Sequence, residues 1–179
     1  IKDAMPAVAP YMEGLLVQIP QPERYAIHKL IVSQKRHAKS QDKKRKDIAQ
    51  ARALIWAMAE DRPYDVKTAI AEASALGQKW SKALDQALDV KFSARPPFRH
   101  TGDSIHFEGA ALGATPTFRV SGSALATLSP KVEETIAAEK NRAAIEDLFR
   151  KKFRSEPSSD TLLMLEDVAT ILRAKRPRP

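Results

Sequence analysis

The first ninety residues combine a helical spacing of apolar residues with proline or glycine where helices would start and stop. Pro22 and Pro63 suit the first turns of two helices, because the first turn does not need the amide hydrogen that proline lacks. Ser40 can cap a helix between them, and Gly77 interrupts the chain before a fourth. We therefore expect four helices, at about 22–37, 41–58, 63–76 and 80–88.

A short apolar run, Leu15–Ile19, precedes these helices and is closed by proline on both sides. Its length and its flanking prolines favour a strand. The first half is thus predicted to be a small antiparallel helical array behind one strand.

The segment 93–103 differs in character, with Pro96 and Pro97 between arginines and then a Thr-Gly-Asp-Ser run. Such a stretch is extended and poor in helix, so we expect a linker between a domain at 1–92 and a second at 104–179. The second domain is predicted to contain strands at 105–109, 117–121 and 161–164, one long helix from Pro130 to about Phe153, a short closing helix and a frayed C-terminus. The predicted fold class is mainly α, with a strand-strand-helix-strand, α+β second half.

Composition excludes several classes of protein. The chain has no cysteine and four dispersed histidines, so disulfide scaffolds, cysteine nucleophiles and a metal site built on imidazole are not expected. No apolar run reaches the length of a membrane span, and we expect a cytoplasmic protein with no membrane partner. The net charge of +8 favours polyanionic partners such as RNA, whereas an aromatic content of 6% argues against a base-stacking platform.

Lys29 lies among the apolar residues Ile27, Leu30 and Ile31. A lysine in such a place is costly to bury unless its ammonium meets an anion from the protein or from a ligand. Asp47, which follows a run of cations, is a candidate for that anion or for a residue that arranges a phosphate site. Two simpler interpretations stay open: an amine of Lys29 that reaches water, and an ordinary first-turn carboxylate at Asp47.

Three segments carry a resemblance to a known family: Pro22–Ser33 with its His-Lys pair, 46–51 after the basic turn, and the Ala-Glu-Asp-Arg-Pro segment at 59–63. With them, residues 17–88 resemble the C-terminal helical part of a bacterial nucleotidyltransferase-fold family, related to abortive-infection toxin nucleotidyltransferases. The resemblance implies that Lys29 contacts the phosphates of a nucleoside triphosphate and that Asp47 positions Lys29 or takes part in the catalytic centre. It also implies that four further residues lie at the phosphate site, namely Arg24, Tyr25, His28 and Lys46.

The chain departs from this family at the catalytic carboxylates. The family carries them in an N-terminal Gly-Ser…Asp-x-Asp element, and Gly122-Ser123 has no Asp-x-Asp after it. Since nucleotidyl transfer needs paired carboxylates to hold Mg²⁺, we expect no metal ligands in this chain and Mg²⁺ only in a complete protein. The chain is accordingly expected to be the C-terminal part of a longer enzyme, which the missing initiator Met favours, and to be an enzyme only when completed.

Residues 104–167 resemble a small bacterial domain family of unknown function, through Phe107-Glu108-Gly109, Val120–Leu125 and Asn141–Ile145. This resemblance implies an accessory module for packing or interaction. Two alternatives to the transferase remain: a non-enzymatic nucleic-acid-binding or regulatory protein that uses its basic helices, and a protein-interaction scaffold. The acceptor, the nucleotide preference and the oligomeric state are left open by the sequence.

Overall fold

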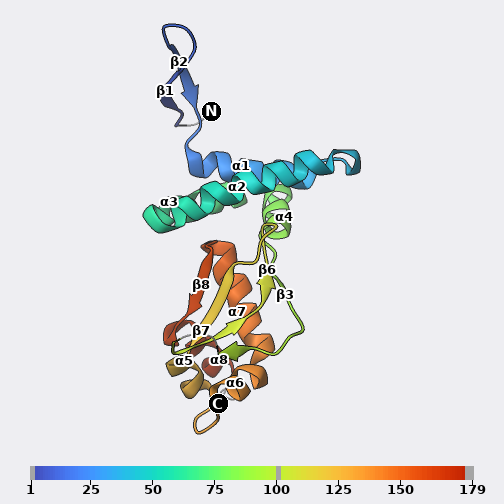
Figure 1. The fold of residues 1–179 in the computed structure, drawn as a ribbon, viewed down its shortest axis with the longest axis vertical. Helices are drawn as coiled ribbons and strands as arrows, with labels where there is room; N and C mark the ends of the chain where they lie inside the picture. Colours follow the sequence, from blue (N-terminus) through green and yellow to red (C-terminus); the bar gives the residue numbers. More distant parts are fainter. Residues whose placement is uncertain (1–2, 100–101, 176–179) are drawn as a thin grey trace. The chain divides into compact units, whose positions relative to one another are not determined.

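A computed structural model describes residues 3–99 and 102–175, and it divides into two compact units, 1–87 and 88–179 (Figure 1). The frayed C-terminus expected from the sequence falls in part on 176–179, outside the described residues. Strand β4, Phe98–Arg99, lies within the segment expected to be a linker. The predicted fold class is confirmed, with helices α1 to α4 following a β-hairpin and a mixed α/β region after them.

The first unit begins with the hairpin β1, Met5–Ala9, and β2, Leu15–Ile19, paired antiparallel. Four helices follow: α1, Pro22–Lys35; α2, Gln41–Asp61; α3, Pro63–Ala75; and α4, Gln78–Ala87. A 3-10 turn, Ala38–Ser40, joins α1 to α2. The strand at 15–19 and the four helices therefore form where the sequence predicts them, and β1 is an additional strand.

Local chemistry explains the helix boundaries of this unit. Pro22 and Pro63 each occupy the first turn of a helix, and Gly77 separates α3 from α4 with a φ of +123°. That backbone conformation is easy for glycine and strained for a residue with a Cβ atom. Ser40 occupies the N-cap position of α2, as predicted, but its side chain makes no capping hydrogen bond. The core consists of apolar residues from all four helices, among them Leu30, Ile31, Ile55, Ile70 and Leu84.

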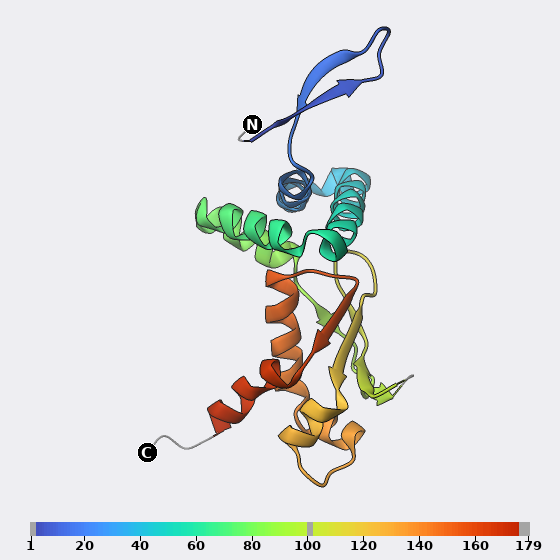
Figure 2. The same ribbon diagram turned by 90° about the vertical axis from the view of Figure 1, so that its left-hand side faces the viewer.

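The second unit is built on a four-stranded sheet in the order β4-β5-β7-β8. The last three strands are β5, Ser104–Phe107; β7, Thr117–Ser121; and β8, Asp160–Leu163, with β8 parallel to β7 and the other pairs antiparallel. Strands β3, Lys91–Phe92, and β6, Gly109–Ala110, form a separate pair. Figure 2 shows α7, Arg142–Ser155, beside one face of the sheet, where Phe149 and Phe153 pack on Phe118.

The long helix predicted from Pro130 to Phe153 is interrupted. Helix α5, Gly122–Leu128, precedes a turn, and α6, Glu134–Lys140, begins only at a cap formed by the Glu133 carboxylate. Asn141 then separates α6 from α7, and its side-chain amide donates to the carbonyl of Ala137 at 2.8 Å. The same carbonyl also accepts from the backbone amide of Asn141, whose own backbone has left the helical conformation, with φ −106° and ψ 11°. Helix α8, Leu165–Lys175, closes the unit.

Candidate phosphate-binding site

Helix α1 presents two different polar faces. Tyr25 and Lys29 lie one turn apart on the same face, and Arg36, the capping residue that follows α1, reaches the same carboxylate as Lys29. Arg24, His28 and Lys35 share another. Helices α1 and α2 run side by side, and the first of these faces meets α2 (Figure 1).

On the face toward α2, one carboxylate joins two cations. Lys29 Nζ donates to Asp47 Oδ1 at 2.8 Å, and Arg36 Nε donates to Asp47 Oδ2 at 3.0 Å. Arg36 Nη2 also lies 2.9 Å from the same Oδ2. The Asp47 side chain is 5% exposed, whereas those of Lys29 and Arg36 are 21% and 34% exposed. The anion is therefore buried, and both cations reach the surface.

The position of Asp47 in its helix decides between the interpretations that the sequence left open. Helix α2 begins at Gln41, so Asp47 is beyond the first turn and faces inward beside Ala51. The first-turn interpretation is therefore wrong, because the helix dipole acts within the first turn. Asp47 is instead the internal anion that Lys29 requires.

The contact shifts the pKa values of both members of the pair. Burial opposes the charged form of Asp47, but hydrogen bonds from Lys29 and Arg36 outweigh it and hold the pKa of Asp47 below its ordinary value. The hydrogen bond to Asp47 raises the pKa of Lys29 against the effect of burial, and Tyr25 adds to the rise. The Lys29 ammonium also lies 5.4 Å from the centre of the Tyr25 ring. Both members of the pair are thus charged over the whole physiological range.

This cluster keeps one net positive charge, since one carboxylate faces two cations. An ammonium has three donors and a guanidinium has five, so Asp47 cannot occupy all of them. The remaining donors of Lys29 and Arg36, on side chains that are partly exposed, can bind an oxyanion such as phosphate.

Arg36 is the member of the cluster that the sequence interpretation missed. A signal was present, because Arg36 follows Lys29 by seven residues, which is two turns of the helix predicted at about 22–37. Arg36 was missed because it belongs to a run of cations that is typical of an exposed connection between helices.

The structure brings only some of the predicted site residues together. Tyr25, Lys29 and Asp47 form one cluster. Arg24 instead forms ion pairs with Asp3 and Glu72, and His28 lies against Trp80 of α4 with ring centres 6.4 Å apart. Lys46 is exposed on α2. The roles of all six residues at a phosphate site stay predictions.

A magnesium site does not fit the residues that the structure describes. Within 3–99 and 102–175 no group of three His, Asp or Glu side chains could hold a metal ion. Paired carboxylates are what Mg²⁺ in a transferase requires, and Asp47, with both oxygens bound to cations, cannot serve as a ligand.

The same part of the chain contains no helix long and apolar enough to cross a membrane.

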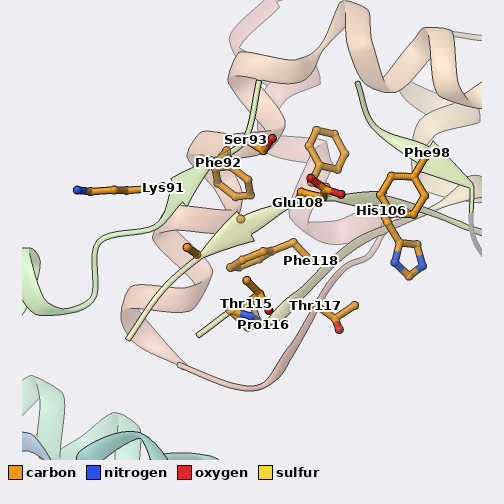
Figure 3. A pocket seen from close by; sticks show the side chains of 13 residues that line it. Lys91, Phe92, Ser93, Phe98, His106, Glu108, Thr115, Pro116, Thr117 and Phe118 are labelled. Atoms are coloured by element: carbon orange, nitrogen blue, oxygen red, sulfur yellow. The ribbon is translucent and has the colours of Figure 1, made fainter. Parts of the chain in front are cut away.

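The second unit has a cavity of its own, of about 550 Å³, beside β3, β5 and β6 (Figure 3). Figure 3 shows the lining residues Phe92 and Phe118, whose ring centres lie 5.1 Å apart, and the pair Phe98 and His106, whose ring centres lie 5.7 Å apart. Glu108, the acid at this cavity, is bound to Arg95. The cavity therefore combines aromatic rings with a carboxylate that is already paired.

A helical unit with a buried carboxylate that fixes two exposed cations is suited to binding phosphate. In a comparison with known families, the sequence model of a family described as "Nucleotidyltransferase" matches residues 1–75, which span the hairpin and α1 to α3. The resemblance stated for the first half is confirmed at this level, and the rest of the chain is unassigned. No curated protein and no solved structure matches the chain significantly.

Proposed function

We propose that residues 1–87 form the phosphate-binding wall of a nucleotidyltransferase. In this proposal Lys29 and Arg36 contact the phosphates of a nucleoside triphosphate, and Asp47 acts as a positioning residue that holds both cations. The family match over residues 1–75 supports a nucleotide substrate.

The observation that carries the proposal is the unequal burial of the cluster. Asp47 is buried and bonded to both cations, while Lys29 and Arg36 remain partly exposed. If the cluster served packing alone, burying the anion with a single partner would suffice. A fixed pair of cations beside a buried anion is instead preorganised for a ligand with several negative oxygens.

The carboxylates for Mg²⁺ would come from another nucleotidyltransferase segment, and the hairpin supports this part of the proposal. One face of the hairpin is entirely apolar, with Met5, Ala7 and Ala9 opposite Ile19, Val17 and Leu15. The other face carries Val8 opposite Leu16 and Pro6 opposite Gln18. Val8 and Leu16 are each 69% exposed. An isolated two-stranded hairpin is only marginally stable in water, and apolar residues on both faces are typical of strands inside a larger sheet. We therefore assign the hairpin to the sheet of the catalytic segment.

The test is calorimetric titration of the 179-residue chain with inorganic triphosphate and with each of the four nucleoside triphosphates. We expect saturable binding that Lys29→Met weakens about tenfold or more, because a hydrogen bond to a charged group contributes about 1.5–3 kcal/mol. Methionine keeps most of the apolar stem of lysine while removing the charge. Lys82→Met, on the exposed surface of α4, is the matched control and should bind as the parent chain does.

A second measurement avoids any effect of substitution on folding. The unsubstituted chain is acetylated with and without triphosphate, and modification of each lysine is measured by mass spectrometry. Triphosphate should protect Lys29 and leave Lys82 unchanged. Equal modification of Lys29 in both samples, or equal affinity of Lys29→Met and the parent chain, would overturn the proposal.

A further inference from the structure

The opposite face of α1 borders a second concave site. A pocket of about 480 Å³ lies between α1, α3 and α4, and its lining includes Ile27, His28, Ala73, Leu76 and Trp80. Its volume is in the range of small-molecule sites, and most of its lining is apolar. The Lys29 cluster does not contribute to it.

Two aromatic side chains, His28 and Trp80, line this pocket, and a cation lies beside Trp80. His28 is exposed, Trp80 is half-buried, and their ring centres lie 6.4 Å apart with the planes tilted by 43°. Lys35 Nζ lies 5.2 Å from the centre of the Trp80 ring. An indole beside an imidazole offers a stacking surface to a planar ring, and the nearby ammonium favours a ligand that also carries negative charge.

Lys35 is the first residue of a basic segment, Lys35–Asp47. It contains seven lysines and arginines against two aspartates. One of these, Asp47, is already bound to Lys29 and Arg36, and the other, Asp42, pairs with Arg45. Lys35, Lys39, Lys43 and Lys46 are all exposed. The excess positive charge therefore faces solvent and begins beside the aromatic pocket.

We propose that the aromatic pocket and the basic segment together bind single-stranded nucleic acid. One unstacked base enters the pocket against Trp80 and His28, and the backbone phosphates on one side of that base follow the basic segment. A duplex keeps its bases stacked and cannot fill the pocket. A lone nucleotide carries too few phosphates to use four exposed lysines spread from Lys35 to Lys46. Although the basic segment includes Arg36 and Asp47, the proposed contacts use only its exposed lysines, so they do not depend on the proposed triphosphate contact.

Tryptophan fluorescence can test the pocket directly, because the chain contains only Trp56 and Trp80. In Trp56→Phe all tryptophan emission comes from Trp80. Adding a single-stranded RNA of about 12 nucleotides, within the usual range of such sites, should quench that emission. In Trp80→Phe the emission of Trp56 should stay unchanged on adding the same RNA.

Fluorescence anisotropy of the labelled RNA tests the affinity at about 50 mM salt, where phosphate contacts are strong. Trp80→Ala should weaken binding about tenfold, in line with the loss of one stacked base. The double variant Lys43→Ala, Lys46→Ala should lower the slope of log affinity against log salt by about 1.4, from about 0.7 for each single-strand phosphate contact. Lys82→Ala with Lys140→Ala, which removes two exposed lysines elsewhere, should leave the slope unchanged.

Three results would overturn the proposal. The first is no binding of the RNA at about 50 mM salt. The second is binding without quenching of Trp80, which would indicate a polyanion surface and not a base pocket. The third is equal quenching by a mononucleotide or a duplex, which would assign the pocket to a different ligand. None of these outcomes bears on Lys29, so this proposal and the triphosphate proposal fail separately.

Discussion

The Lys29 ammonium lies 2.8 Å from the Asp47 carboxylate, joining the middle of α1 to the second turn of α2. Arg36 shares that carboxylate from the C-terminal end of α1. Asp47 thus fixes two points along the chain against α2, and in our proposal the same contact positions the two cations for a ligand.

Replacing Asp47 by Asn should destabilise the first unit. The change leaves Lys29 and Arg36 without their anion. The side-chain amide that replaces the carboxylate has a poorer set of hydrogen-bond partners. Removing one member of a buried ion pair costs about 3–5 kcal/mol, and partial exposure of both cations lowers our expectation to about 2 kcal/mol. Urea unfolding measures this loss. Asp61→Asn, at the exposed end of the same helix, is the control and should change stability little; an equal effect of both changes would contradict the assignment.

The stabilisation by the pair should depend on pH in a defined way. Because the folded-state pKa of Asp47 is lowered, its contribution is complete above the unfolded value of about 3.9 and is lost as pH falls through the folded value. Because the folded-state pKa of Lys29 is raised, its contribution to stability is complete below the unfolded-state pKa of about 10.4. That contribution is lost as pH rises through the folded-state pKa. The stability difference between the parent chain and Asp47→Asn should therefore be constant between about pH 4 and 10 and shrink below pH 4. A difference that persists unchanged at pH 2 would show that the ion pair is not its source.

Charged residues on the hairpin should reduce the apolar surface of the first unit. Val8 and Leu16 are cross-strand partners and the most exposed apolar residues of the two strands. We expect the double change Val8→Lys, Leu16→Lys to lower the binding of an apolar dye and any self-association at high concentration. Dye fluorescence and sedimentation velocity measure these effects. Ile136→Lys, an exposed site on α6, serves as the control, and an equal response there would indicate that the hairpin is not the responsible surface.

Gly109 should not tolerate a side chain. A Cβ atom there would lie 3.0 Å from Phe118 Cε2 and 3.1 Å from Phe92 Cδ1, and Phe118 is fully buried against Phe149 and Phe153. Because the Phe118 ring is held between Phe149 and Phe153, Gly109→Ala should destabilise the second unit by about 1–3 kcal/mol. Thermal unfolding measures the loss. Gly102→Ala, at a position with a positive φ but open space around it, separates backbone strain from overpacking, and a larger loss there would contradict the packing argument.

The sequence determined the helical half because its signals are local. Proline at the first turn, glycine after a helix and apolar residues at helical spacing act within a few residues, so α1 to α4 form where these signals place them. Local signals also explain the failure in the second half. Apolar spacing continues past Asn141, and only the contacts of its amide with Ala137 and Ser129 show that the helix is divided.

The requirement for an anion near Lys29 was also evident from the sequence, because a lysine among isoleucines and a leucine is unfavourable alone. Tertiary structure decided the rest. It placed Asp47 inside the helix pair, added Arg36 from two turns along α1, and turned Arg24 and His28 toward α3 and α4. Spacing along one helix fixes which residues share a face, but the packing of neighbouring helices decides what each face meets. For this chain, that packing separates a cation pair fixed by Asp47 from an aromatic pocket beside Trp80.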